Sequence, residues 1–148
     1  MQRGIIIRRM ELSDLDGVYN LERKLFPNPW PKSFFETDLK SKNSIGFVVE
    51  YEGSIIGYSM ASYDDGKFHI TNIAVDREFQ RQGIASKLMH ILEDLALGRG
   101  CYYAYLEVRI DNTAAINLYR SLGYEIAYKR NNYYIDGDDA YVMEKELK

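Results

Sequence analysis

A glycine-containing turn in the middle of the chain constrains its fold more than any other segment. The turn, Gln80–Ala85, follows an apolar strand pattern at 70–75 and precedes an amphipathic helix pattern at 86–97. The first N–H groups of a helix have no intrahelical partner and lie at the positive end of the helix dipole. We therefore expect the turn to bind a phosphorylated ligand, although a glycine that merely caps a helix produces the same local pattern.

Two common phosphate loops do not fit this turn. A Walker loop requires Lys and then Ser or Thr after its last glycine, and a dinucleotide-binding turn requires three spaced glycines after the first strand. Neither pattern is present. The turn instead resembles the Gln/Arg-x-x-Gly-x-Gly/Ala signature of the GCN5-related N-acetyltransferase (GNAT) family, with Gln80, Gly83 and Ala85 at the signature positions.

Members of that family use the turn to hold the pyrophosphate of acetyl-CoA, so the resemblance implies acetyl-CoA as a co-substrate. The residues of this region that it assigns to acetyl-CoA are Ile73, Ala74, Val75, Gln80, Arg81, Gln82, Gly83, Ile84, Ala85 and Ser86.

Length and composition limit the class of protein. A chain of 148 residues is long enough for one domain with its own core, so we expect a single domain over residues 1–148. The net charge of −3 argues against bulk nucleic-acid binding. One cysteine and two histidines provide neither an internal disulfide nor a zinc cluster, so no metal site is expected.

Hydropathy predicts no membrane association. The apolar run near the N-terminus is three residues long before charged residues resume, which is too short for the core of a signal peptide. No later segment approaches the length of a membrane span. We therefore expect a cytoplasmic location.

The alternation of apolar and polar residues predicts a mixed α/β (α+β) fold with an antiparallel meander first and one βαβ crossover inside. Ser13 and Asp16 have capping-box spacing at the start of the first helix. In the helix after the turn, the Lys, Glu and Asp side chains are expected to face solvent. The GNAT resemblance implies the same order, with a mostly antiparallel central sheet of about seven strands flanked by about four helices. The expected strands are 3–9, 45–51, 54–63, 68–75, 101–108, 125–134 and 140–147, and the expected helices are 12–25, 32–42, 86–97 and 112–121.

A second informative segment contains Glu107 and Tyr119. A carboxylate inside an apolar strand is costly to bury alone, so Glu107 either has a partner such as Arg109 or lines a wet site. Tyr119 lies on the apolar face of the next predicted helix, as a core tyrosine would. Amide formation from an amine and a thioester needs a base for the amine and a proton for the departing thiolate. A carboxylate and a phenol suit these two tasks.

The segment from Leu106 to Tyr124 resembles that of the RimI-type ribosomal-protein N-acetyltransferases and the archaeal N-terminal acetyltransferases. The resemblance implies that Glu107 is the general base and Tyr119 the general acid beside the thioester. It also implies that the strand carrying Glu107 splays from its neighbour to admit the pantetheine arm. Asn112 is the expected helix N-cap and, by the resemblance, a further contact to acetyl-CoA.

Two other segments are candidates for the substrate-binding site. The sequence around Tyr133 and Tyr134 resembles the Tyr-Tyr-x-Asp-Gly-x-Asp-Ala hairpin that holds the substrate in protein N-terminal acetyltransferases, although an ordinary hairpin would also use the Asp-Gly turn. The loop after the first helix would form the opposite wall. Eukaryotic-type enzymes place a glutamate where this loop has Asn28, so the loop is nearer the bacterial type. Its candidate residues are Phe26, Pro27, Asn28 and Trp30.

Two more residues have open roles. Glu22 lies near the centre of an apolar helix face, where it is either a satisfied structural carboxylate or a contact to the substrate amine. His69 matches a strand histidine of archaeal relatives, where it helps to order a water. Which of Glu107, Glu22 and His69 orders the catalytic water is left open.

The predicted reaction is acetyl transfer from acetyl-CoA to the N-terminal α-amine of proteins or peptides, including ribosomal proteins. An α-amine has a pKa near ~7.8 and a lysine near ~10.4, so a lysine needs roughly 3.5 kcal/mol more to present a neutral amine at neutral pH. A lysine or small-molecule acetyltransferase and a non-catalytic acyl-CoA-binding domain are the alternatives. An auxiliary subunit or an association with the ribosome is left open as a further partner.

Overall fold

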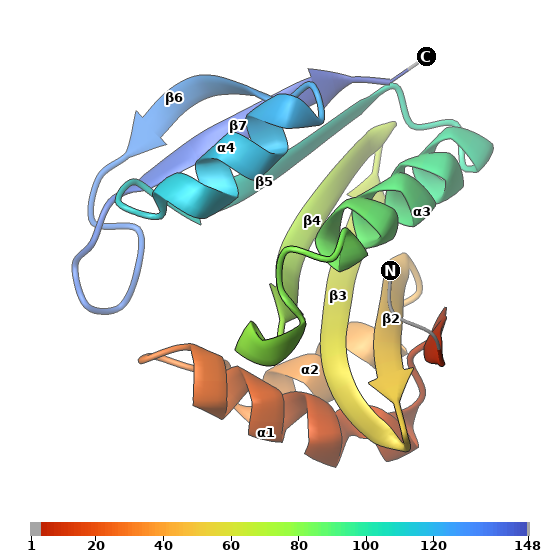
Figure 1. The fold of residues 1–148 in the computed structure, drawn as a ribbon. Helices are drawn as coiled ribbons and strands as arrows, with labels where there is room; N and C mark the ends of the chain where they lie inside the picture. Colours follow the sequence, from red (N-terminus) through yellow and green to blue (C-terminus); the bar gives the residue numbers. More distant parts are fainter. Residues whose placement is uncertain (1–3, 148) are drawn as a thin grey trace. The chain divides into compact units, whose positions relative to one another are not determined.

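The computed structural model describes residues 4–147 and has the predicted mixed α/β architecture (Figure 1). In the described part of the chain, a seven-stranded sheet has the order β1-β2-β3-β4-β5-β7-β6. β4 and β5 pair in parallel, whereas β1–β2, β2–β3, β5–β7 and β6–β7 are antiparallel. The strands are β1 (Ile5–Arg9), β2 (Ser44–Tyr51), β3 (Ser54–Asp64), β4 (Lys67–Val75), β5 (Tyr103–Arg109), β6 (Glu125–Arg130) and β7 (Ala140–Glu146). The helices are α1 (Leu15–Leu25), α2 (Lys32–Lys40), α3 (Ile84–Gly98) and α4 (Thr113–Ser121), with 3-10 turns at Leu12–Asp14 and Arg77–Phe79.

The described chain divides into two compact units. The first contains the residues up to Ser62 together with Thr71–Leu92, and the second contains Tyr63–Ile70 together with the residues from Glu93 onward. β3, β4 and α3 each contribute residues to both units. No helix within residues 4–147 is long and apolar enough to cross a membrane.

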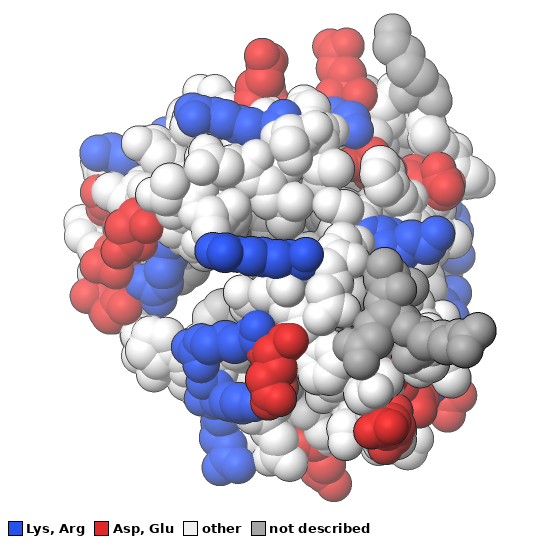
Figure 2. Space-filling model, viewed as in Figure 1, with Lys and Arg blue, Asp and Glu red and all other residues white. Residues whose placement is uncertain are grey.

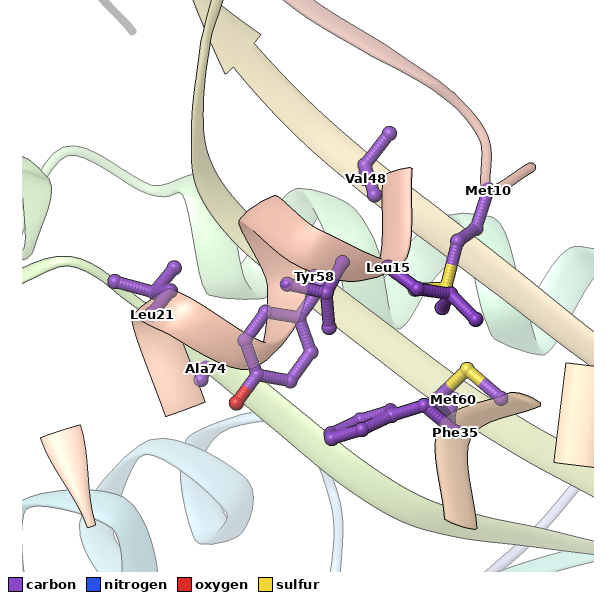
Figure 3. Packing of buried hydrophobic residues seen from close by; sticks show 9 residues of the cluster. Met10, Leu15, Leu21, Phe35, Val48, Tyr58, Met60 and Ala74 are labelled. Atoms are coloured by element: carbon purple, nitrogen blue, oxygen red, sulfur yellow. The ribbon is translucent and has the colours of Figure 1, made fainter. Parts of the chain in front are cut away.

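The core of the first unit forms where α1 and α2 pack on β2 and β3 (Figure 3). Phe35 of α2 meets Tyr58 of β3 edge to face, with ring centroids 5.8 Å apart. A Cβ at Gly17 of α1 would come within 2.9 Å of the Ile55 side chain, so glycine permits the close approach of helix and strand. Each fully buried large apolar side chain contributes about 2 kcal/mol to folding. The buried cluster comprises Met10, Leu15, Val18, Leu21, Phe35, Val48, Tyr58, Met60 and Ala74.

The first helix does not begin as predicted. The capping box involves Glu11 and Asp14, not Ser13 and Asp16, and a 3-10 turn precedes α1. The Asp14 carboxylate accepts the Glu11 N–H at 2.8 Å and two hydrogen bonds from Arg8 at 2.7 and 2.9 Å. These Arg8 contacts lower the pKa of Asp14. The Arg8–Asp14 ion pair, between residues six positions apart, thus adds to the capping contact of Asp14.

The second unit contains a buried carboxylate that the helix pattern placed in solvent. Glu93 of α3 is buried and accepts hydrogen bonds from the Tyr124 hydroxyl at 2.8 Å and from Lys145 Nζ at 2.9 Å. The prediction for this residue was wrong because its cation lies on β7, beyond the reach of helical periodicity. The other predicted elements are confirmed with shifts of a few residues at their ends. The start of the strand predicted at 3–9 lies partly outside the described residues.

The last predicted hairpin is present, because β6 and β7 pair antiparallel, but its loop is longer than predicted. β6 ends at Arg130, so Tyr133 and Tyr134 lie between β6 and β7 and not on a strand that continues to residue 134. Within the loop, Asn132 and Gly137 have φ values of 53° and 90°. Residues with positive φ interrupt the regular pairing of a strand.

Candidate active site

The predicted phosphate-binding turn lies in the first unit and has the geometry that an anion needs. Lys87 N–H donates to the carbonyl of Gly83, the residue before α3, at 3.0 Å, so the backbone N–H groups before Lys87 precede the helical ladder. Arg81 and Gly83 have φ values of 64° and 82°. An ideal Cβ on Gly83 would meet no heavy atom within 4 Å, so a ligand has room to approach the backbone there.

The flanking residues of the turn have mixed environments. Gln80 donates from Nε2 to the Val75 carbonyl at 2.9 Å, which ties the turn to the end of β4. Ala74, Val75 and Ile84 are buried, whereas Arg81 and Gly83 are exposed. Among the remaining predicted acetyl-CoA residues here, Ile73, Gln82, Ala85 and Ser86 are half-buried.

Basic and acidic side chains lie interspersed over the face drawn in Figure 2.

Glu22 is a satisfied carboxylate in the first unit. Its side chain is on a residue with 3% exposure and accepts hydrogen bonds from Trp30 N–H at 3.0 Å, Asn72 Nδ2 at 3.0 Å and the Tyr58 hydroxyl. Burial, followed by the negative charge of Glu22, raises the pKa of Tyr58. Three donors thus satisfy this buried carboxylate, as expected for the structural role and not for a contact to the substrate amine.

The loop after α1 is held by the hydrogen bond from Trp30 N–H to Glu22 and by aromatic packing on the core. Phe26 and Trp30 pack on the core of the first unit, and the Trp30 ring lies 5.2 Å from that of Phe35. Pro27 and Asn28 are exposed. The predicted substrate loop therefore has an anchored aromatic side and an exposed side.

Glu107 of β5 pairs with His69 of β4 in the second unit. The distance from His69 Nε2 to Glu107 Oε1 is 2.7 Å, and the two side chains are 26% and 8% exposed. An ionised carboxylate only accepts, so the imidazole donates from Nε2. Arg109 is not the partner of Glu107, as the sequence had suggested, because it binds Asp136 and Asp138 instead.

The strand register explains why this histidine reaches this carboxylate. The parallel pairing places His69 opposite Tyr105, and their rings stack with centroids 4.3 Å apart. Tyr105 and Glu107 lie two residues apart and therefore on one face of β5. The pairing of β4 with β5 extends to Ile70 and Leu106, and Glu107 follows directly. Tyr105 was not predicted as a site residue, although its position two residues before Glu107 could have indicated it.

Tyr119 of α4 is buried, with 7% exposure. Burial, and to a smaller extent the neighbouring Tyr134, raises the pKa of Tyr119. Its ring meets Tyr124 edge to face at 6.3 Å. The environment keeps this phenol protonated well above neutral pH. Asn112 is confirmed as the N-cap of α4, since its side chain accepts the Ala115 N–H at 3.1 Å.

The paired tyrosines of the β6–β7 loop approach Glu107. Their rings meet edge to face at 4.9 Å. Burial and then the charge of Glu107 raise the pKa of Tyr133, and burial raises the pKa of Tyr134 to about 12. The second unit thus brings together a carboxylate, an imidazole and several protonated phenols. Such a group can accept a proton from an amine and supply one to a leaving group.

Comparisons with known proteins show the family of the chain. The sequence model described as the acetyltransferase (GNAT) family matches residues 15–124. The chain is 34% identical to an N-alpha-acetyltransferase of Sulfurisphaera tokodaii over 95% of this chain and 92% of that protein. It is also 34% identical to the ribosomal protein bS18-alanine N-acetyltransferase of Escherichia coli K12, over 93% of this chain and 94% of that protein.

Solved structures show the same likeness. The crystal structure of the Escherichia coli ribosomal-protein-S18-alanine N-acetyltransferase matches with a TM-score of 0.88 and 33% identity, covering 97% of this chain and 94% of that one. That of Ard1 from Thermoplasma volcanium matches with a TM-score of 0.91 and 26% identity, covering 98% and 99%. The chain belongs to the GNAT family of acetyltransferases. It is therefore an acyltransferase whose acyl donor is acetyl-CoA.

Proposed function

We propose that this enzyme transfers the acetyl group of acetyl-CoA to the N-terminal α-amine of a protein or peptide, with Glu107 as general base and Tyr119 as general acid. The observation that carries the proposal is the His69–Glu107 pair at 2.7 Å, with Tyr133 and Tyr134 beside it. The relatives from Sulfurisphaera tokodaii and Escherichia coli are named N-alpha-acetyltransferase and ribosomal protein bS18-alanine N-acetyltransferase, and these names support the same substrate class.

Acetyl-CoA supplies the acetyl group as a thioester. The turn at 80–86 would hold its pyrophosphate through backbone N–H groups at the start of α3, where the helix dipole favours negative charge. The open space at Gly83 suits this role. The remaining acetyl-CoA contacts that we propose are Ile73, Ala74, Val75, Asn112 and Tyr119.

Glu107 would accept the proton of the incoming ammonium group, directly or through water. His69 engages one carboxylate oxygen, and a carboxylate has about four acceptor positions, so capacity for the proton remains. The hydrogen bond from His69 fixes the orientation of the carboxylate. This step needs only a modest base, because an α-amine has a pKa near ~7.8.

Tyr119 would donate a proton to the departing thiolate. Burial keeps its phenol neutral at physiological pH, so the proton is present when the thioester bond breaks. A thiol has a pKa near ~8.5, which is lower than that of a phenol with a pKa above 10. Proton transfer from the phenol to the thiolate is therefore uphill, and the position of the buried phenol beside the thiolate must offset that cost.

In the second unit, Tyr133 and Tyr134 would contact the substrate's first residues. In the first unit, Phe26, Pro27, Asn28 and Trp30 are further proposed substrate contacts. Phenol hydroxyls can donate to the backbone carbonyls of an extended peptide, and aromatic faces can cover apolar side chains. A protein N-terminus is therefore the proposed partner, and a ribosomal protein is one candidate.

Two versions of one peptide test this function. The first has a free N-terminus and an internal lysine, and the second has the same sequence with a formylated N-terminus. We expect the purified protein to acetylate only the first when acetyl-CoA is supplied. Acetylation of both peptides at equal rates would make the enzyme a lysine acetyltransferase.

A further inference from the structure

Arg109 of β5 makes three contacts with the β6–β7 loop. Its Nη1 atom donates to Asp136 at 3.0 and 3.2 Å and to Asp138 at 2.8 Å. Its guanidinium carbon lies 4.1 Å from the centroid of the Tyr134 ring. One side chain on a strand therefore holds two carboxylates and one aromatic ring of the same loop.

Contacts inside the loop add to this arrangement. Asn132 N–H donates to Asp139 at 2.9 Å, and Asp138 N–H donates to Asp136 at 3.1 Å. Tyr134 N–H bonds to the Asp138 carbonyl at 3.1 Å. These bonds shape the loop locally, whereas the contacts of Arg109 connect it to β5.

Arg109 and Glu107 lie on the same face of β5 because side chains of a strand alternate. Both are half-buried, and Leu106 and Val108 on the other face are buried. The loop that Arg109 holds carries Tyr133, whose phenol lies near Glu107. The position of this phenol beside the carboxylate thus depends on an anchor two residues along the strand.

We propose that Arg109 is a positioning residue for the acceptor: it clamps the loop 131–139 so that Tyr133 and Tyr134 face the peptide substrate beside Glu107. This inference rests on the proposed function. Arg109 acts through the loop and touches neither reacting group, so its loss should weaken acceptor binding more than it slows the chemical step.

The chemistry requires arginine at this position. A planar guanidinium can stack on the Tyr134 ring and bond to two carboxylates at once, whereas a lysine ammonium cannot reproduce both. Single exposed ion pairs contribute little, but a network with fixed geometry contributes more. Arg109 is 23% exposed, compared with 53% for Asp138.

Arg109→Met and Arg109→Lys variants test the clamp, with Arg99→Met as the matched control. Arg99 also bonds to a tyrosine hydroxyl and lies over its ring, that of Tyr63 at 5.1 Å, and both residues lie outside the loop. We expect Arg109→Met to raise the KM for the acceptor about 10-fold, equivalent to the loss of roughly one strong contact. The KM for acetyl-CoA should stay within about twofold, and Arg109→Lys should recover part of the loss.

A double variant, Asp136→Asn with Asp138→Asn, removes the two loop carboxylates that Arg109 binds. This variant tests the clamp even if Arg109→Met fails to fold. Both variants should accelerate hydrogen exchange of the amides in 131–139, while Arg99→Met leaves it unchanged. An unchanged acceptor KM in the loop-side variant, or unchanged exchange in 131–139, would overturn the proposal. The acceptor used is whichever amine the wild-type enzyme acetylates. A wild-type enzyme that prefers lysine would refute the N-terminal assignment. Hydrogen exchange of the amides in 131–139 would still test whether Arg109 holds the loop.

Discussion

His69 and Glu107 are joined by a hydrogen bond of 2.7 Å between Nε2 and Oε1, although they lie 38 residues apart in the sequence. Register produces this contact, because the parallel pairing sets His69 beside Tyr105, and Glu107 follows on the same face of β5. The carboxylate thus has a neighbour that orients it through a hydrogen bond. This arrangement is suited to a base that must accept a proton.

Glu107→Gln should lower kcat by about 10²-fold or more, because the amide cannot take the amine proton. The KM for acetyl-CoA should stay within a factor of two. His69→Gln should cause a smaller loss, since it removes orientation and leaves the base. The exposed histidine of α3 provides the control, so His90→Gln should match the wild type. Equal rates for Glu107→Gln and the wild type in steady-state assays would remove Glu107 from the mechanism.

Tyr119→Phe should lower kcat by about 10²-fold, because the variant retains the ring but has no proton to donate. Tyr124→Phe is the matched control, since the neighbouring Tyr124 is also buried and its hydroxyl binds Glu93. This control should lose stability by about 1–3 kcal/mol and retain its kcat. Urea unfolding and initial rates measured on the same preparations separate the two effects. Equal kcat losses in both variants would assign Tyr119 to the core alone.

The turn and the opposite end of α3 offer a matched pair of glycines. Gly83 and Gly100 have φ values of 82° and 78°, and an ideal Cβ on either meets nothing within 4 Å. Alanine at either position should cost about 1–2 kcal/mol, because an L-residue is strained at positive φ. Only Gly83→Ala should also raise the KM for acetyl-CoA, by several-fold, as titration with acetyl-CoA can show. Equal KM values in the two variants would place the pyrophosphate elsewhere.

Stability should fall at alkaline pH. Burial raises the pKa values of Tyr58, Tyr119 and Tyr124, and that of Tyr134 to about 12. The pKa of each of these tyrosines is higher in the folded state than the value of ~10 in the unfolded state. The free energy of unfolding is therefore undiminished below pH ~10, and it falls as the pH rises from ~10 through the folded pKa. For Tyr134 the window runs from ~10 to about 12. Each such group contributes up to ~1.4 kcal/mol per pH unit.

Urea unfolding between pH 8 and pH 11 measures this loss. The Tyr124→Phe variant has one buried phenol fewer, so its free energy of unfolding should fall less steeply with pH. A free energy of unfolding that stays constant from pH 9 to pH 11 would contradict the burial of these phenols.

Local patterns predicted much of the fold. Turn residues separated the strands of the meander, and Asn112 was identified as an N-cap from its position alone. Contacts between distant residues were not predictable in the same way. Glu93 is buried because Lys145 lies 52 residues away along the chain and supplies its cation. A helical pattern contains no information about such a partner.

The candidate site shows the same division. Glu107 was identified because a carboxylate in an apolar strand needs an explanation, which was either a partner such as Arg109 or a wet site. Arg109 instead bonds to Asp136 and Asp138, which lie 27 and 29 residues further along. A hairpin with Asp-Gly turn chemistry was predicted because these loop residues look like an ordinary turn, whereas the arginine contacts hold them in a longer loop.

The position of the acetyl group on one peptide tests the central claim most directly. The peptide carries a free α-amine and one internal lysine, and it is incubated with the enzyme and a limiting amount of acetyl-CoA before tandem mass spectrometry. We expect acetylation of the α-amine, with the lysine unmodified and with no product from Glu107→Gln in the same time. Acetylation of the lysine in preference to the α-amine, or no acetylated peptide at all, would contradict it.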